Sequence, residues 1–133
     1  MKENIIKNKT IEFALRIINL SKFLQKKKEF VISRQVLRSG TSVGALVRES
    51  EHAESKLDFV HKIAIAQKEA NETVYWLELL YRSDFIDEKM YESLEFDIVE
   101  IQKILSSIII TSKKNIKSKK SIRPLAKPYP IKK

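Results

Sequence analysis

The chain has 133 residues, with 26 Lys or Arg against 17 Asp or Glu, and its formal net charge is +9. This length predicts one domain, and the absence of cysteine excludes disulfides, thiolate metal sites and thiol nucleophiles. No apolar run reaches the ~18 residues that a membrane-spanning helix needs. We therefore expect a cytoplasmic protein with no membrane partner.

Turn-forming residues are scarce before residue 112. That part of the chain contains only two glycines and no proline, and all three prolines follow residue 123. So few turn formers exclude a fold built from many hairpins. The composition predicts an all-α domain of long helices joined by short polar loops.

The first predicted helix covers residues 5–25. Its apolar stripe repeats at intervals of three and four residues, through Thr10, Phe13, Ile17, Leu20 and Leu24. A run of three lysines follows at residues 26–28. Cations suit the C-terminal end of a helix, so we expect the helix to end there.

The second predicted helix covers residues 32–50. Val36, Gly40, Val43 and Val47 form its stripe, and Gly44 follows one turn after the first glycine. Two glycines inside a helix cost about 1 kcal/mol each relative to alanine. Close packing of another backbone at Gly40 and Gly44 would offset that cost, and a break near Gly40 is the alternative.

The third predicted helix begins at Ser55, which can act as N-cap with Asp58 three residues later. Its stripe repeats as a heptad through Phe59, Ile63, Ala66, Ala70, Thr73, Leu77 and Leu80. Further residues on another side of this helix define a predicted oligomer interface: Ile65, Glu69, Glu72, Trp76 and Leu79. One helix of a four-helix domain cannot be covered on all sides by its own chain, so we expect a second subunit there.

The fourth predicted helix starts near Asp84 or Asp87, either of which can cap it. Its stripe runs through Tyr91, Leu94, Ile98, Ile101, Leu105 and Ile108, and the pattern fades at Thr111. The opposite face of this helix is rich in acidic residues and is expected to face solvent. Four such helices predict an up-down-up-down antiparallel four-helix bundle over residues 1–111.

The remaining segment, residues 112–133, carries the whole net charge. It holds nine basic residues and no acidic one: Lys113, Lys114, Lys117, Lys119, Lys120, Arg123, Lys127, Lys132 and Lys133. We expect a disordered basic tail that binds RNA or DNA through phosphate neutralisation. A tail that only improves solubility, or that docks on acidic surface of the same or a neighbouring subunit, stays open as an alternative.

A block within residues 34–80 resembles a known family. It contains RSGTSVGA at residues 38–45, Arg48-Glu49, the Ser55-x-x-Asp58-Phe59 start, KEANET at residues 68–73 and YWL at residues 75–77. These strings are similar to the four-helix-bundle proteins encoded by intervening sequences of bacterial 23S ribosomal RNA genes. That family is in turn similar to accessory proteins of diversity-generating retroelements. Leu46 departs from the pattern, which has a polar residue there.

The resemblance implies an antiparallel four-helix bundle without enzymatic activity. It also implies a ring-like homo-oligomer, with five subunits among relatives, and association of the retroelement members with RNA and a reverse transcriptase. We therefore expect a non-catalytic, self-assembling scaffold that binds nucleic acid and has no cofactor. A purely structural homo-oligomer is the alternative.

Only a few residue pairs in the sequence would support an enzymatic function. Glu49 with His52, and Asp58 with His61, form carboxylate-x-x-His pairs of the kind that place two metal ligands on one helix face. Asp58 and His61 do not align with the apolar stripe of their helix, and the two pairs flank a loop, so ordinary polar residues around a turn explain them better. Arg48 and His52 are spaced more closely than the Arg and His of bundle-type ribonucleases. A metal-dependent or ribonuclease-type enzyme is thus the less favoured alternative.

Overall fold

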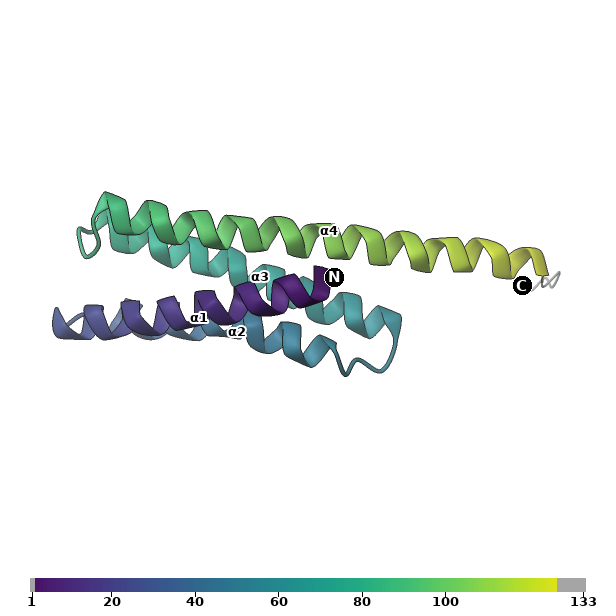
Figure 1. Ribbon diagram of the computed structural model, residues 1–133, viewed down its shortest axis with the longest axis horizontal. Coiled ribbons are helices and arrows are strands. Elements are labelled where there is room, and N and C mark those ends of the chain that lie inside the picture. Colours follow the sequence, from purple (N-terminus) through teal and green to yellow (C-terminus); the bar gives the residue numbers. More distant parts are fainter. Residues whose placement is uncertain (1, 127–133) are drawn as a thin grey trace.

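A computed structural model describes the backbone of residues 2–126 and the side chains of residues 4–118. Within them the chain forms four helices: α1 (Lys2–Lys26), α2 (Val31–Ser50), α3 (Lys56–Arg82) and α4 (Glu88–Ala126). The helices alternate in direction, and each contacts its neighbours along the chain, while α1 also contacts α4 (Figure 1). The predicted all-α, antiparallel four-helix bundle is confirmed.

The core follows the predicted stripes closely. Almost every stripe residue of α1, α2 and α3 is buried, and so is the stripe of α4 from Leu94 to Ile108. One shift occurs in the first turn of α3, where Val60 is buried and Phe59 is only half-buried. Ile6 and Ile86 join the core from the helix ends. The apolar repeats therefore predicted the buried face of each helix, but they did not predict the buried residues at the helix ends.

The two glycines of α2 lie against α1. A Cβ atom on Gly40 would lie 2.9 Å from Cγ1 of Ile17, and one on Gly44 would lie 3.2 Å from Cβ of Thr10. The helix is continuous from Val31 to Ser50, so the alternative of a break near Gly40 does not hold. The missing side chains let α1 approach α2 closely, and that packing offsets the helix-propensity cost.

Side chains and backbone amides define the helix ends. Ser55 Oγ accepts a hydrogen bond from the Asp58 amide at 3.0 Å, as predicted for the start of α3. Of the two candidate caps for α4, Asp87 is the one used, because its Oδ1 accepts from the Met90 amide at 2.8 Å. The carboxylate of Glu29 accepts from the amides of Ile32 and Ser33 and so caps α2.

Two non-glycine residues adopt a left-handed backbone conformation where helices end. Lys28 follows α1 with φ 64°, and Asp84 follows α3 with φ 67°. In each case the next amide bonds back five residues, from Glu29 to the Leu24 carbonyl and from Phe85 to the Leu80 carbonyl, both at 2.9 Å. This is the Schellman arrangement, whose left-handed residue is usually glycine.

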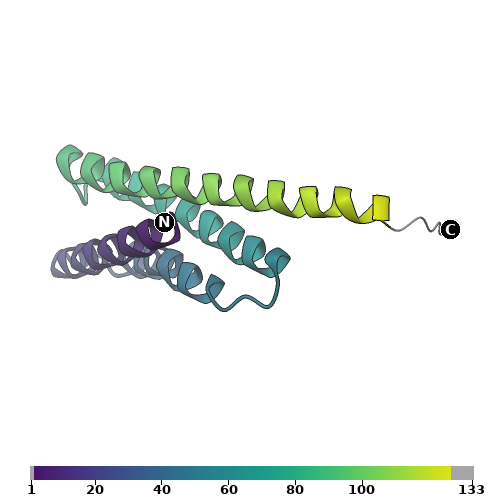
Figure 2. The same ribbon diagram turned by 45° about the vertical axis from the view of Figure 1, so that its right-hand side comes forward.

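Helix α4 is longer than its apolar pattern predicted. It continues beyond Thr111 to Ala126 and runs past the ends of the other three helices (Figures 1 and 2). Residues 112–123 contain no glycine or proline, and lysine is a good helix former, so nothing in the sequence stops the helix before Pro124. The basic segment therefore begins as a cationic extension of α4, a name used below for residues 112–126.

No helix in the part of the chain that the structure describes is long and apolar enough to cross a membrane.

Candidate nucleic-acid interface

The cationic extension presents lysines beyond the end of the bundle. Lys113, Lys114 and Lys117 are exposed, and none of them forms an ion pair with any side chain that the structure describes. Lys119, Lys120 and Arg123 lie on the helical backbone, although their side chains are outside the described set. Lys127, Lys132 and Lys133 lie outside the described residues altogether.

The charges of the bundle are largely neutralised within the chain. Seven carboxylates pair with Lys or Arg among the described side chains. Two of these pairs join α1 to α4, Lys9 to Glu100 at 3.1 Å and Arg16 to Asp97 at 2.6 Å. The sequence shows the same separation of charge along the bundle, since residues 1–38 have net charge +7 and residues 39–111 have −7. Seven described acidic side chains of the bundle therefore already have a cationic partner.

The predicted interface on α3 contains a polar network that closes within one chain. Arg38 of α2 donates to Glu69 at 3.0 Å and to Glu72, and the Trp76 indole also donates to Glu72, at 2.9 Å. The Trp76 hydrogen bond, followed by that from Arg38, holds the pKa of Glu72 below its ordinary value. The hydrogen bond that Arg38 donates to Glu72 is likewise the largest cause of the raised pKa of Arg38.

The apolar members of that predicted interface are half-buried within the chain. Trp76 packs partly against the core and meets Tyr75 edge-on at 5.1 Å between ring centroids. Ile65 and Leu79 are also half-buried. The second apolar side of α3 is thus covered in part by its own chain.

More exposed apolar side chains lie on α1 and α4, outside the interface predicted from the sequence. Ile11, Leu15 and Ile18 repeat at four and three residues on the outer face of α1, with 38%, 57% and 37% exposure. This set is called the α1 outer stripe below. Phe96 of α4 is 70% exposed, although its helix face was predicted to be solvated and acidic. The period of the outer stripe was visible in the sequence beside the stronger buried one.

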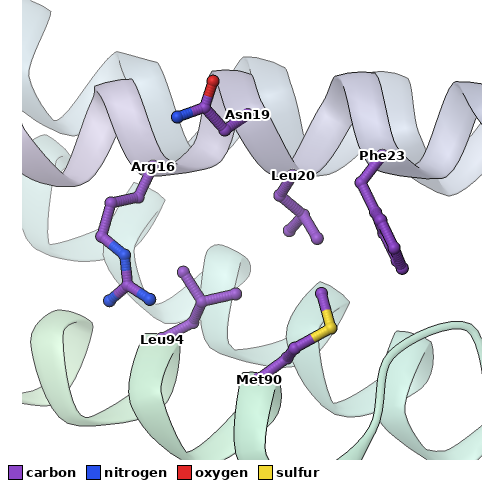
Figure 3. Close-up of a pocket in the computed structure, with 6 residues that line it drawn as sticks. All are labelled: Arg16, Asn19, Leu20, Phe23, Met90 and Leu94. Atoms are coloured by element: carbon purple, nitrogen blue, oxygen red, sulfur yellow. The ribbon is translucent and has the colours of Figure 1, made fainter.

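A groove follows the seam between α1 and α4, which is the sparsest helix contact of the bundle. Its volume is about 230 Å³, and Leu20 and Phe23 of α1 face Met90 and Leu94 of α4 across it (Figure 3). Arg16 closes one end through its bonds to Asp97 and to Ser93. The groove is mostly apolar and holds no arrangement of acid and base groups.

The two carboxylates considered for metal binding serve other contacts. Glu49 pairs with Lys62 at 3.6 Å, and Asp58 accepts from the Glu54 amide at 3.0 Å while its own amide bonds Ser55. Over the residues described, no three His, Cys, Asp or Glu side chains are grouped so that they could hold a metal ion.

Comparison with known proteins agrees with the resemblance seen in the sequence. A family model described as 23S rRNA-intervening sequence protein matches residues 2–107, and no curated protein sequence matches. A crystal structure described as a protein with unknown function from the S23 ribosomal protein family of Bacteroides thetaiotaomicron is 58% identical, with a TM-score of 0.81. That alignment covers 82% of this chain and 98% of that chain. The chain therefore belongs to the family of 23S rRNA-intervening sequence proteins.

Proposed function

We propose that this protein is a non-catalytic scaffold that assembles with copies of itself and binds RNA through the cationic extension of α4. One observation carries the proposal: the whole net charge of the chain lies in residues 112–133, and their first part is a helix that projects past the bundle. The family match ends at residue 107, so this feature adds to the shared bundle.

Electrostatics supports a nucleic acid as the partner of the extension. Lysines without carboxylate partners neutralise phosphates and release counterions, which gives binding that tolerates any sequence and weakens steeply with salt. The description of the family refers to 23S rRNA, which makes ribosomal RNA the first RNA to test. A reverse transcriptase, which the resemblance to retroelement accessory proteins implies, is the protein partner to test with it.

Self-assembly is supported by the apolar side chains that the fold leaves outside. The α1 outer stripe and Phe96 are more exposed than Ile65, Trp76 and Leu79 of α3. A row of large apolar residues on a helix face is typical of a protein contact. We therefore place the main contact between copies at the α1 outer stripe, and we keep the α3 set as a secondary contact.

The absence of catalysis is supported by the nature of the perturbed groups. The hydrogen bonds from Trp76 and then from Arg38 lower the pKa of Glu72, and the bond to Glu72 is the largest cause of the raised pKa of Arg38. Burial, and then Glu95, raises the pKa of Tyr91, which stacks on Tyr81 at 4.6 Å between ring centroids. These contacts join helices of the bundle and do not combine a nucleophile with a base.

The competing function is a structural oligomer in which the extension docks on acidic surface of a neighbouring copy. The ion pairs of the bundle reduce the acidic surface available for such docking, because seven carboxylates already have cationic partners.

Truncation after Thr111 tests the proposal, because it removes the extension and keeps every buried core residue. We expect the full chain to shift RNA in a gel at low salt and the truncated chain to lose that binding while its circular dichroism keeps a cooperative transition. Equal RNA affinity of both chains would contradict the proposal. Loss of self-association without any RNA binding would favour the structural oligomer.

A further inference from the structure

A second region of unpaired positive charge lies at the opposite end of the bundle from the cationic extension. Lys22, Lys26, Lys28 and Arg34 surround the turn between α1 and α2, are all exposed, and form no ion pair with a described side chain. The nearby carboxylate of Glu29 is directed to the amides of Ile32 and Ser33 at 3.1 and 2.7 Å. The turn therefore keeps a local excess of cations that the overall charge balance of the bundle conceals.

A cavity of about 250 Å³ lies beside these cations, between α1 and α2. It is lined by Ser21, Gln25, Phe30, Ser33, Arg34 and Leu37. Its volume is below the ~300–1,000 Å³ of pockets for drug-sized ligands, which suits one small planar group. Polar and aromatic groups share the lining, so this cavity differs from the apolar groove at the seam of α1 and α4.

The polar floor of the cavity is ordered by hydrogen bonds. The hydroxyls of Ser21 and Ser33 lie 2.9 Å apart in a buried contact, and Gln25 Nε2 donates to Ser21 Oγ at 3.1 Å. These bonds use the amide nitrogen of Gln25 and leave its carbonyl oxygen without a described donor. Arg34 adds guanidinium donors with no described acceptor, so the lining offers both donors and acceptors to a ligand.

The aromatic ring at the rim is exposed without a packing role in the core. Phe30 is 52% exposed, whereas Phe23 and Phe85 pack against the core. Phe30 and Arg34 are four residues apart at the start of α2, which places them on the same side of the helix. An exposed ring beside a free arginine and several lysines is the combination that stacks a base and holds its phosphate.

We propose that this cavity binds one unstacked nucleotide of a single-stranded RNA, with the base against Phe30 and the phosphate at Arg34 and Lys28. The inference rests on the proposed RNA-binding function and gives it a second contact, at the end of the bundle remote from the cationic extension. The extension supplies general phosphate attraction, and the cavity selects single strands, because a base in a duplex is not free to stack on Phe30.

Fluorescence anisotropy of a labelled single-stranded RNA with the full chain tests the site. Phe30→Ala is expected to weaken binding about 5- to 150-fold, the range found when one base–aromatic stack is removed. Val31→Ala is the matched control, since Val31 is 69% exposed next to Phe30 but does not line the cavity. Arg34→Gln should also weaken binding, while Arg48→Gln, an exposed arginine at the other end of α2, should not. A duplex of the same sequence should bind the Phe30→Ala variant as well as it binds the unchanged chain.

Photocrosslinking gives a direct readout of the same site. Trypsin cuts after Lys28 and Arg34 and releases peptide 29–34, so a strand containing thiouridine should attach to that peptide. Crosslinks only beyond residue 111, with equal affinities of the Phe30→Ala and Val31→Ala variants, would overturn the site and leave the proposed function intact. Absence of RNA binding by the full chain at low salt would remove both. If Phe30→Ala and Val31→Ala weaken binding to anionic vesicles equally and neither changes the RNA affinity, this surface contacts a membrane and the nucleotide site is overturned.

Discussion

The side chain of Ile17 occupies the space that a side chain on Gly40 would need. A Cβ atom there would lie 2.9 Å from Cγ1 and 3.0 Å from Cγ2 of Ile17, which is fully buried. The β-branched isoleucine is stiff and cannot turn away. The contact sets how closely α1 and α2 pack.

Gly40→Ala is therefore expected to destabilise the protein. Overpacking costs about 1–3 kcal/mol, and removal of a helical glycine gains about 1 kcal/mol, so the free energy of unfolding should fall by up to about 2 kcal/mol. Gly44→Ala meets Thr10 at 3.2 Å and is expected to be closer to neutral. Urea denaturation followed by circular dichroism measures both. An increase in stability for Gly40→Ala would show that α1 can move away.

Lys28 and Asp84 carry a conformational cost that glycine would remove. A left-handed conformation costs a residue with a Cβ about 1–2 kcal/mol. Lys28→Gly and Asp84→Gly should each raise the free energy of unfolding by about 1 kcal/mol in thermal or urea denaturation. Asp84→Ala is the control, because alanine keeps the cost and loses any polar compensation. A Gly variant no more stable than its Ala counterpart would contradict the assigned conformation.

Glu72 should make stability depend on pH in the acid range. Its folded pKa is depressed by Trp76 and Arg38, so its stabilising contribution is complete above the ordinary value of 4.5 and is lost as the pH falls through the depressed folded pKa. Glu72→Gln should lower stability at neutral pH and flatten the acid limb of the profile. Trp76 is the only tryptophan, so its fluorescence reports unfolding. A parallel acid limb in the variant would assign the loss to other carboxylates.

The α1 outer stripe should control assembly. Leu15→Glu places a charge at the centre of the stripe and is expected to weaken self-association by about tenfold or more, as at an interface hot spot. Leu57→Glu is the matched control, because Leu57 is 62% exposed at the start of α3 and lies away from the stripe. Light scattering across a concentration series distinguishes them. If Leu15→Glu and Leu57→Glu weaken self-association equally, or if neither weakens it, the main contact between copies does not lie at the α1 outer stripe and the α3 set becomes the candidate.

The sequence was most informative where a single physical rule decides the structure. The spacing of Phe13, Ile17 and Leu24 predicted their burial, because a 3.6-residue helix has one face against the core. The Ser55 cap followed from local hydrogen bonding in the same way. Lys28 shows the limit, because it adopts the left-handed conformation that usually falls to glycine, and a lysine at that position does not predict it.

The candidate surfaces were harder to predict for a related reason. The basic run at residues 112–133 is evident from the sequence. That its first part continues α4 is harder to predict, because it depends on the absence of a helix stop signal. The sequence did not identify Arg34 and Phe30 as parts of one site, because they share a cavity with Ser21 and Gln25 of another helix. Glu72 was assigned to a subunit interface, and its contact with Arg38 across α2 and α3 appeared only in three dimensions.

The most direct test of the central claim is the salt dependence of RNA binding by two variants of equal charge. In the first, Lys113, Lys114 and Lys117 of the cationic extension are replaced by glutamine; in the second, the exposed bundle lysines Lys68, Lys89 and Lys103 are replaced. Each phosphate contact with a single strand contributes about −0.7 to the slope of log K against log salt, so the first variant should lose about 2 from its magnitude. The second should keep the slope of the unchanged chain. Equal slopes in both variants would show that the extension does not contact the RNA.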